Sequence, residues 1–272
     1  MKKLLITLAM LFSLGAYAND SVPTSVKFEK GNHFAITTSF NQKLLDNFAE
    51  KVLSYDDDEM YIYFDTPGGS VIALSRMARI MKSSGIKFTC VANFAASAGF
   101  MLFQHCDNRL LLTDGILMSH NWSGGFRGEA PRILTMFYTV QAIVDQLEET
   151  VINKLNIDKS KYDELINKNL WMTKALAEKY AAVDGVISNV TCSKEIINER
   201  VPTTINFGFF GLQSKKVYKS GCPLIQKAYS KKPKREDRYE ETEYSLFDLA
   251  QKSYVLENAN WIYTGSKQGL ND

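Results

Sequence analysis

Residues Met60 to Phe100 read MYIYFDTPGGSVIALSRMARIMKSSGIKFTCVANFAASAGF. The first seven residues are apolar, aromatic and β-branched, which predicts a strand, and PGGS at Pro67–Ser70 predicts a turn. Apolar residues at helical spacing then predict a helix over 71–85, and IKFTCVA predicts the next strand. Strands that alternate with helices in this way indicate an α/β fold with a mostly parallel sheet.

The same alternation extends on both sides of this stretch. A strand and an amphipathic helix precede it, in HFAITTSF and QKLLDNFAEKVLSY. The elements expected after it are helices at 97–106, 132–155, 159–169 and 174–182, and strands at 108–113 and 115–120. Thr173 is the expected N-cap of the last of these helices. We therefore expect one α/β domain over residues 19–200.

The N-terminus has the pattern of a secretory signal peptide. Lys2 and Lys3 precede an apolar run over 4–14, and AYA at 16–18 predicts cleavage after Ala18. The alternative is an uncleaved anchor, but the run is shorter than the roughly 20 residues that a membrane span needs. We expect residues 1–18 to be a signal peptide and the protein to be periplasmic or secreted.

Charge and composition exclude some classes of function. Lys and Arg total 32 against 30 Asp and Glu, and removal of Lys2 and Lys3 would leave a neutral balance, so no nucleic-acid partner is expected.

Residues 201–272 form a C-terminal extension, in which Lys231–Tyr244 is a dense mixed-charge run and Ser245–Tyr263 a possible closing helix. Such a run is most often a solvated linker or surface.

Four cysteines would mature in an oxidising compartment after export. They are Cys90, Cys106, Cys192 and Cys222, and four cysteines allow three pairings. No C-x-x-C spacing occurs, which argues against zinc. We favour a disulfide between Cys192 and Cys222, because both lie in the less regular C-terminal third. Cys90 lies in an expected buried strand and could be a small core residue.

Three features of the sequence could supply the chemical groups of a single active site. The turn with Gly68 and Gly69 follows a strand, where ligands bind in α/β sheets, and its backbone N–H groups could stabilise an oxyanion. Ser97 begins a helix, beside the free amide of Ala98, and His120 ends a strand. Taken singly, these would be an ordinary turn, a helix cap and a structural histidine, but together they indicate a serine nucleophile with a histidine base.

The stretch from Tyr61 to Gly125 resembles the Clp protease proteolytic subunit, whose superfamily includes the crotonases and signal peptide peptidase A. The matching motifs are an apolar strand into PGGS, AASAG around a serine, and a strand that ends in histidine; the likeness spans about 35–190. It implies the spiral α/β fold of that superfamily, with a long handle-like helix. It also implies Ser97 as nucleophile, His120 as general base and the amides of Gly69 and Ala98 as oxyanion hole.

Other residues take roles from the same resemblance. Gly68 and Ser70 are expected to line the bound substrate. The triad aspartate of the family corresponds to Asn169, which could orient the imidazole but could not offset its charge. Asp114 and Asp184 are the nearby acids in sequence, and Ser123 is a weaker alternative nucleophile.

We therefore expect an exported serine endopeptidase that cleaves peptides or unfolded proteins without a cofactor. Because ATP is not expected outside the cytoplasm, no ATPase partner is expected, while the handle-like helix implies a homo-oligomer. The alternatives are a catalytically silent binding or scaffold protein, on account of Asn169, and a crotonase-like acyl-CoA enzyme, against which export argues.

Overall fold

Parallel strands form the centre of this computed structural model, which describes residues 22–207, 213–225 and 228–229. The main sheet has the order β2-β3-β4-β5-β6, with β7 paired to β5. Its strands are β2 His33–Ile36, β3 Glu59–Thr66, β4 Lys87–Ala96, β5 Asn108–Ser119, β6 Leu170–Met172 and β7 Gly185–Ile187. All of these pairings are parallel except that of β5 with β6. The α/β fold with a mostly parallel sheet is thus confirmed.

One strand replaces two that the sequence pattern separates. The runs at 108–113 and 115–120 form a single long strand, β5, which changes register against β4 between Ala92 and Phe94. Gly115 lies within it, and a Cβ there would come within 2.8 Å of the Ala92 carbonyl oxygen. The missing side chain allows the two backbones to approach, so the expected break at residue 114 is an irregularity within a continuous strand.

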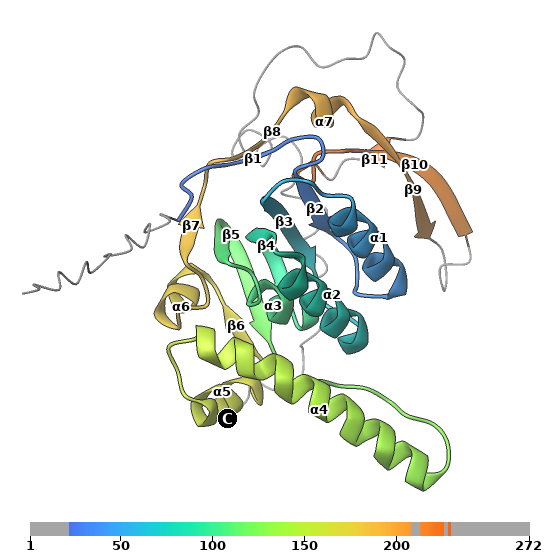
Figure 1. Ribbon diagram of the computed structural model, residues 1–272, viewed down its shortest axis with the longest axis vertical. Coiled ribbons are helices and arrows are strands. Elements are labelled where there is room, and N and C mark those ends of the chain that lie inside the picture. The colour runs from blue at the N-terminus through green and yellow to red at the C-terminus, as the bar shows by residue number, and fades with distance from the viewer. Residues whose placement is uncertain (1–21, 208–212, 226–227, 230–272) are drawn as a thin grey trace, which may run out of the picture.

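Three helices cover one face of the sheet, as Figure 1 shows. They are α1 Gln42–Leu53, α2 Val71–Ser84 and α3 Ala98–Phe103. Asn41 and Ser70 cap α1 and α2 by accepting hydrogen bonds from the backbone N–H groups of Leu44 and Ala73. Gly85 ends α2 in the left-handed conformation that glycine adopts at little cost. Phe48, Leu74 and Phe100 are among the side chains that these helices bury against the sheet.

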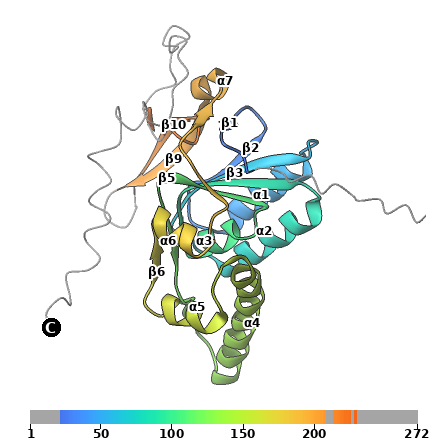
Figure 2. The ribbon, with the colours of Figure 1, turned by 90° about the vertical axis from the view of Figure 1, so that its left-hand side faces the viewer.

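A second layer covers the opposite face. It contains β1 Val26–Phe28, β8 Val190–Cys192 and α7 Lys194–Asn198, and it packs on Tyr63, Val91 and Leu110 of the sheet. Figure 2 shows the sheet lying between the helices and this second layer. Burial on both faces explains why the central strands are almost continuously apolar in sequence.

Two disulfides fasten these layers. Cys192 is bonded to Cys222, with Cα atoms 5.9 Å apart, and so ties β8 to the segment after β10. Cys90 is bonded to Cys106, with Cα atoms 6.1 Å apart, and ties β4 to the chain that leaves α3. The interpretation of Cys90 as a plain core residue is therefore wrong, because both sulfurs are buried but paired.

The remaining helices are α4 Ala130–Lys154, α5 Lys159–Ile166 and α6 Lys174–Lys179. Of these, α4 and α5 lie at the end of the molecule where β5 finishes, whereas α6 lies beside α3 (Figures 1 and 2). The long helix expected near 132–155 corresponds to α4, whose first half projects from the body of the fold. Within the described ranges, no helix combines the length and apolar character that a membrane span requires.

The start of the C-terminal extension is an antiparallel sheet with the order β11-β10-β9. Its strands are β9 Arg200–Phe207, β10 Gln213–Ser220 and β11 Ala228–Tyr229. The expected signal peptide, the charged run at 231–244 and the possible closing helix at 245–263 lie outside the described residues.

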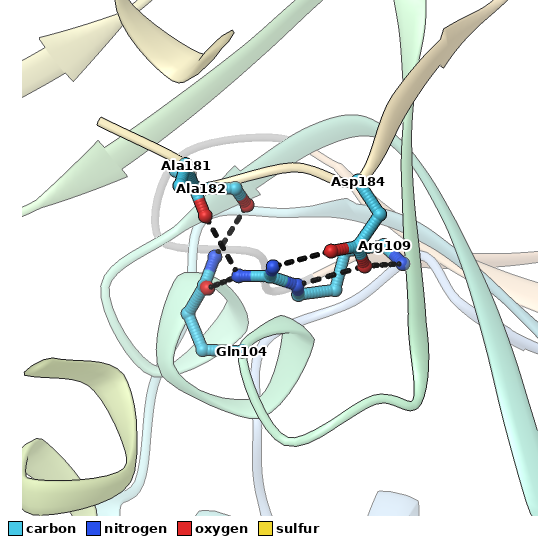
Figure 3. A network of polar contacts seen from close by, with 5 residues as sticks. All are labelled: Gln104, Arg109, Ala181, Ala182 and Asp184. Atoms are coloured by element: carbon cyan, nitrogen blue, oxygen red, sulfur yellow. Dashed lines mark hydrogen bonds and ion pairs between the residues drawn. The ribbon is translucent and has the colours of Figure 1, made fainter. Parts of the chain in front are cut away.

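A buried polar network joins β5 to the loop before β7 (Figure 3). The guanidinium group of Arg109 donates to both carboxylate oxygens of Asp184, at 3.0 and 2.5 Å, and the Arg109 side chain is only 5% exposed. It also donates to the Gln104 side chain and to the Ala181 carbonyl oxygen. The network fixes the start of β5, the strand that directly precedes His120.

We expect Asp184→Ala to lower the free energy of unfolding by about 3 kcal/mol or more, because it leaves a buried guanidinium group without its counter-charge. Urea unfolding followed by circular dichroism measures this loss. Lys161→Ala is the control, since it removes an ion pair with Glu164 whose side chains are about half exposed, at 45% and 51%. Equal unfolding midpoints for the two variants would show that the buried network is not stabilising.

Candidate active site

Ser97 lies at the junction of β4 and α3 in an unusual backbone conformation. Its φ is 56° and its ψ is −121°, and among the described non-glycine residues only Ser97, Asn169 and Ala181 have positive φ. It occupies the N-cap position of α3, yet its side chain makes no capping hydrogen bond. A strained residue at a sharp strand-to-helix turn projects its side chain away from both elements, which is the geometry of an exposed nucleophile.

The hydroxyl group of Ser97 meets His120 instead. Its Oγ atom lies 2.8 Å from Nε2 of His120, which directly follows the last residue of β5. The pairing of β4 with β5 brings the two residues together, and the Ser97 amide donates to the Met118 carbonyl oxygen at 2.8 Å. For Nε2 to accept the serine proton, the imidazole must carry its own proton on Nδ1.

The glycine turn approaches the same serine. Gly68 and Gly69 have φ of 97° and 144°, and a Cβ on Gly68 would lie 2.7 Å from Cβ of Ser97. Phe40 holds this turn by donating to the Gly68 carbonyl oxygen and accepting from the Ser70 amide. Within the described residues, the amides of Gly69 and Ala98 have no hydrogen-bond acceptor. Free amides beside a nucleophile are the donors that an oxyanion hole requires.

Ser70, one of the residues expected to line the substrate, has a structural contact. Its Oγ atom accepts a hydrogen bond of 3.3 Å from the Ala73 amide and thereby caps α2. Ser123, the alternative nucleophile, is exposed on the loop after His120 and makes no hydrogen bond to the imidazole among the described residues.

Asn169 lies just before β6, with φ of 57° and an exposed side chain. β5 and β6 pair Ser119 with Leu170, so one further step of this antiparallel register would place residue 169 opposite His120. The backbone turns out of the strand at that step, and the structure gives no hydrogen bond between the Asn169 side chain and His120. Asparagine is among the non-glycine residues that adopt left-handed geometry most readily.

No other acid in the described ranges bonds to the imidazole in place of the family aspartate. Asp184 is held by Arg109, and Asp114 is exposed at the irregular part of β5.

The backbone next to His120 is fixed by a different contact, which the sequence analysis did not predict. The buried hydroxyl groups of Ser119 and Tyr162 lie 2.8 Å apart and join the end of β5 to α5.

The loop after His120 also borders a groove of about 520 Å³ between α4 and α5. Its lining residues are Asn121, Trp122, Ser123, Gly124, Phe126, Phe137, Gln141, Asp145, Glu148, Lys159, Asp163 and Ile166. The sequence signal for it is the aromatic pair in NWSGGF directly after His120.

The family model described as Clp protease matches residues 25–190, which include every element that carries Ser97, His120 and the glycine turn. The chain belongs to the Clp protease family. A relative named as the ATP-dependent Clp protease proteolytic subunit of Borreliella afzelii (strain PKo) is 24% identical over 132 residues, 47% of this chain and 67% of the relative. Subunit 1 of Borreliella burgdorferi (strain ATCC 35210 / DSM 4680 / CIP 102532 / B31) is 24% identical over 132 residues, 47% of this chain and 68% of the relative.

The expected resemblance to the Clp proteolytic subunit is thus confirmed, and at the family level it implies a serine-type peptidase. The match ends at residue 190, so α7 and the strands β9 to β11 are not part of the matched region. The Cys192–Cys222 disulfide lies wholly in this additional segment.

We expect Gly68→Ala to reduce the reaction of Ser97 with a fluorophosphonate probe by about 100-fold, because the new methyl group would displace Ser97. Gly31→Ala is the matched control: Gly31 also has positive φ, at 89°, but no atom lies within 4 Å of the place that its new methyl group would take. The rate of labelling and the unfolding midpoint of both variants are measured together. Equal labelling rates would contradict the close packing of the turn on the serine.

Proposed function

We propose that this chain is an exported serine endopeptidase that cleaves peptides or unfolded proteins without an ATP-driven partner. The observation that carries the proposal is the 2.8 Å contact between Ser97 Oγ and His120 Nε2 at a backbone position with positive φ. A serine that serves only as a helix cap would turn its hydroxyl group toward the amides of α3.

The chemistry is acyl transfer in two steps. The Ser97 oxygen attacks the peptide carbonyl carbon while His120 takes the hydroxyl proton, and His120 then gives that proton to the leaving amine. The amides of Gly69 and Ala98 stabilise the negative oxygen of the tetrahedral intermediate. Water then attacks the acyl-enzyme, with His120 again as the base, and frees Ser97.

Export is supported by the pattern of residues 1–18 and by the disulfides. All four cysteines among the described residues are paired, and disulfides persist mainly in oxidising compartments. A periplasmic or secreted enzyme has no supply of ATP, so its substrates would be short, unfolded or flexible chains that enter without an unfoldase.

We expect a fluorophosphonate probe to label the wild-type protein, Ser97→Ala to abolish labelling, and His120→Ala to slow it by at least about 100-fold through loss of the general base. Ser123→Ala is the control, because this residue is the alternative nucleophile, and it should label at the wild-type rate. Labelling is followed by gel fluorescence and by mass spectrometry of the modified peptide. A wild-type protein that never labels, or that labels on Ser123, would overturn the assignment.

A second candidate is a binding or scaffold protein with an inactive site. It is favoured by one observation: within the described ranges, no carboxylate hydrogen-bonds to His120. An imidazole without that partner loses stabilisation of its charged form and of the tautomer that the reaction needs.

We expect Asn169→Asp to raise the labelling rate of Ser97 by about tenfold or more. The reverse change, Asp→Asn, can lower the turnover rate of a serine protease triad by roughly 10⁴-fold, so the expected gain is only part of that effect. Residue 169 directly follows the end of the β5–β6 pairing, next to the residue that faces Ser119, so a carboxylate there could come near the imidazolium and stabilise it. Asn156→Asp, at an exposed asparagine in the loop between α4 and α5, is the control. An unchanged rate for Asn169→Asp would show that this position does not act on the imidazole.

Self-association through α4 is the second part of the proposal. Clp proteolytic subunits form oligomers, and α4 carries a run of exposed apolar side chains on its projecting half. They are Leu134 (54% exposed), Met136 (39%), Phe137 (40%) and Tyr138 (65%). Contiguous exposed apolar side chains of this kind mark surfaces that contact another protein.

We expect Leu134→Glu/Tyr138→Glu to convert an oligomer into a single chain, because charges cannot be buried in an apolar contact without a partner. Sedimentation velocity measures the mass of both forms. Leu53→Glu, at an isolated apolar residue of α1 that is 87% exposed, is the control and should keep the wild-type mass. A wild-type protein that sediments as one chain at every concentration would refute association through α4.

A further inference from the structure

The groove between α4 and α5 begins one residue after His120. Asn121 and Trp122 form its near wall, and Asn121 is held by a hydrogen bond of 2.5 Å from its amide to the Asn167 side chain. Nε2 of His120 contacts Ser97, so the groove begins one residue from the general base of the proposed reaction. A cavity of about 520 Å³ is large enough for one long side chain.

One wall of the groove is aromatic. Trp122 contacts Phe126 and Phe137, with ring centroids 6.3 and 5.3 Å apart, and all three rings line the cavity. The indole N–H group donates to the Gln141 side chain at 2.8 Å, which fixes the orientation of the ring. Aromatic faces pack against hydrocarbon chains and also attract cations.

The part of the groove that follows Gln141 along α4 is acidic. Asp145, Glu148 and Asp163 line it, and Lys159 is the one basic side chain among the lining residues. Lys159 lies 2.9 Å from Asp163 but 3.8 Å from Glu148, so it balances only one of the three carboxylates closely. Desolvation raises the pKa of Glu148, and the nearby Lys159 opposes this only in part, so a second cation would stabilise the charged carboxylate.

We propose that this groove receives the substrate side chain beside the cleaved bond and selects lysine or arginine there. The proposal rests on the peptidase function of Ser97. The long hydrocarbon stem of a basic side chain fits the aromatic wall, and its cationic head meets Asp145 and Glu148. A leucine or norleucine side chain would fill the same space but would add no positive charge, so Asp145 would keep only its hydrogen bond from Gln141, and Glu148 only the more distant Lys159.

The test compares two fluorescent peptides that differ at one position, lysine or norleucine, because norleucine has the same stem without the ammonium group. Their binding to the Ser97→Ala protein is measured by fluorescence anisotropy, so no peptide is consumed. We expect the lysine peptide to bind roughly tenfold more tightly, as a close charge pair provides. Equal affinity of the two peptides would overturn the proposal.

Two variants locate the effect in the groove. Asp145→Asn changes an exposed residue, and Glu148→Gln changes a half-buried one; each should reduce the preference for lysine several-fold. Glu164→Gln is the control, because this exposed carboxylate lies on α5, the other helix beside the groove, but pairs with Lys161 and Lys168 outside it. An equal loss in Glu164→Gln would show a general charge effect and contradict the proposal.

The two proposals fail in different ways. If the wild-type protein labels on Ser97 but binds both peptides equally, the peptidase function stands and the selectivity is wrong. If nothing labels but the lysine peptide is preferred and Asp145→Asn removes the preference, the groove is a basic-peptide site on an inactive protein. If wild-type labelling succeeds, cleavage after or before lysine in a peptide mixture, read by mass spectrometry, should exceed cleavage at norleucine by a similar factor.

Discussion

The backbone of Gly68 lies so close to Ser97 that no side chain fits between them. This contact joins the end of β3 to the end of β4, and it forces β4 to turn sharply into α3. The strain at Ser97 is sustained because the surrounding core is buried and dense: Phe40, Ala98 and Phe100 all pack in the same cluster. The position of the hydroxyl group is therefore a property of the whole sheet edge and not of the local sequence alone.

Strand register then supplies the second residue. The Ser97 amide donates to the Met118 carbonyl oxygen, two residues before His120, so the pairing of β4 with β5 sets the separation of serine and imidazole. The start of β5 is held by the Arg109–Asp184 pair and its end by the Ser119–Tyr162 contact. A long strand fixed at both ends can hold a histidine at its tip with little freedom, which suits a group that must transfer a proton within hydrogen-bond distance.

The sequence predicted the fold class and the cluster of Ser97, His120 and the glycine turn, because these depend on periodicity and on where parallel strands end. It failed at Cys90, since a buried cysteine in a strand looks the same whether or not it is paired. It also split β5 at residue 114, because Asp114 and Gly115 together resemble a turn in sequence, whereas in space the glycine permits a close strand contact. The partners of Arg109 and Tyr162 lie 75 and 43 residues away, and no local pattern indicates such pairs.

Phe137 connects the two surfaces for which we propose partners. Its ring lies 5.3 Å from Trp122 in the groove and 5.7 Å from Tyr138 on the exposed side of α4. An oligomer formed through α4 would cover part of Phe137, which is 40% exposed in the single chain, and would hold the aromatic wall in place. Since a preformed pocket binds its ligand without first ordering its own side chains, assembly would then strengthen selection of the substrate without any new contact to Ser97.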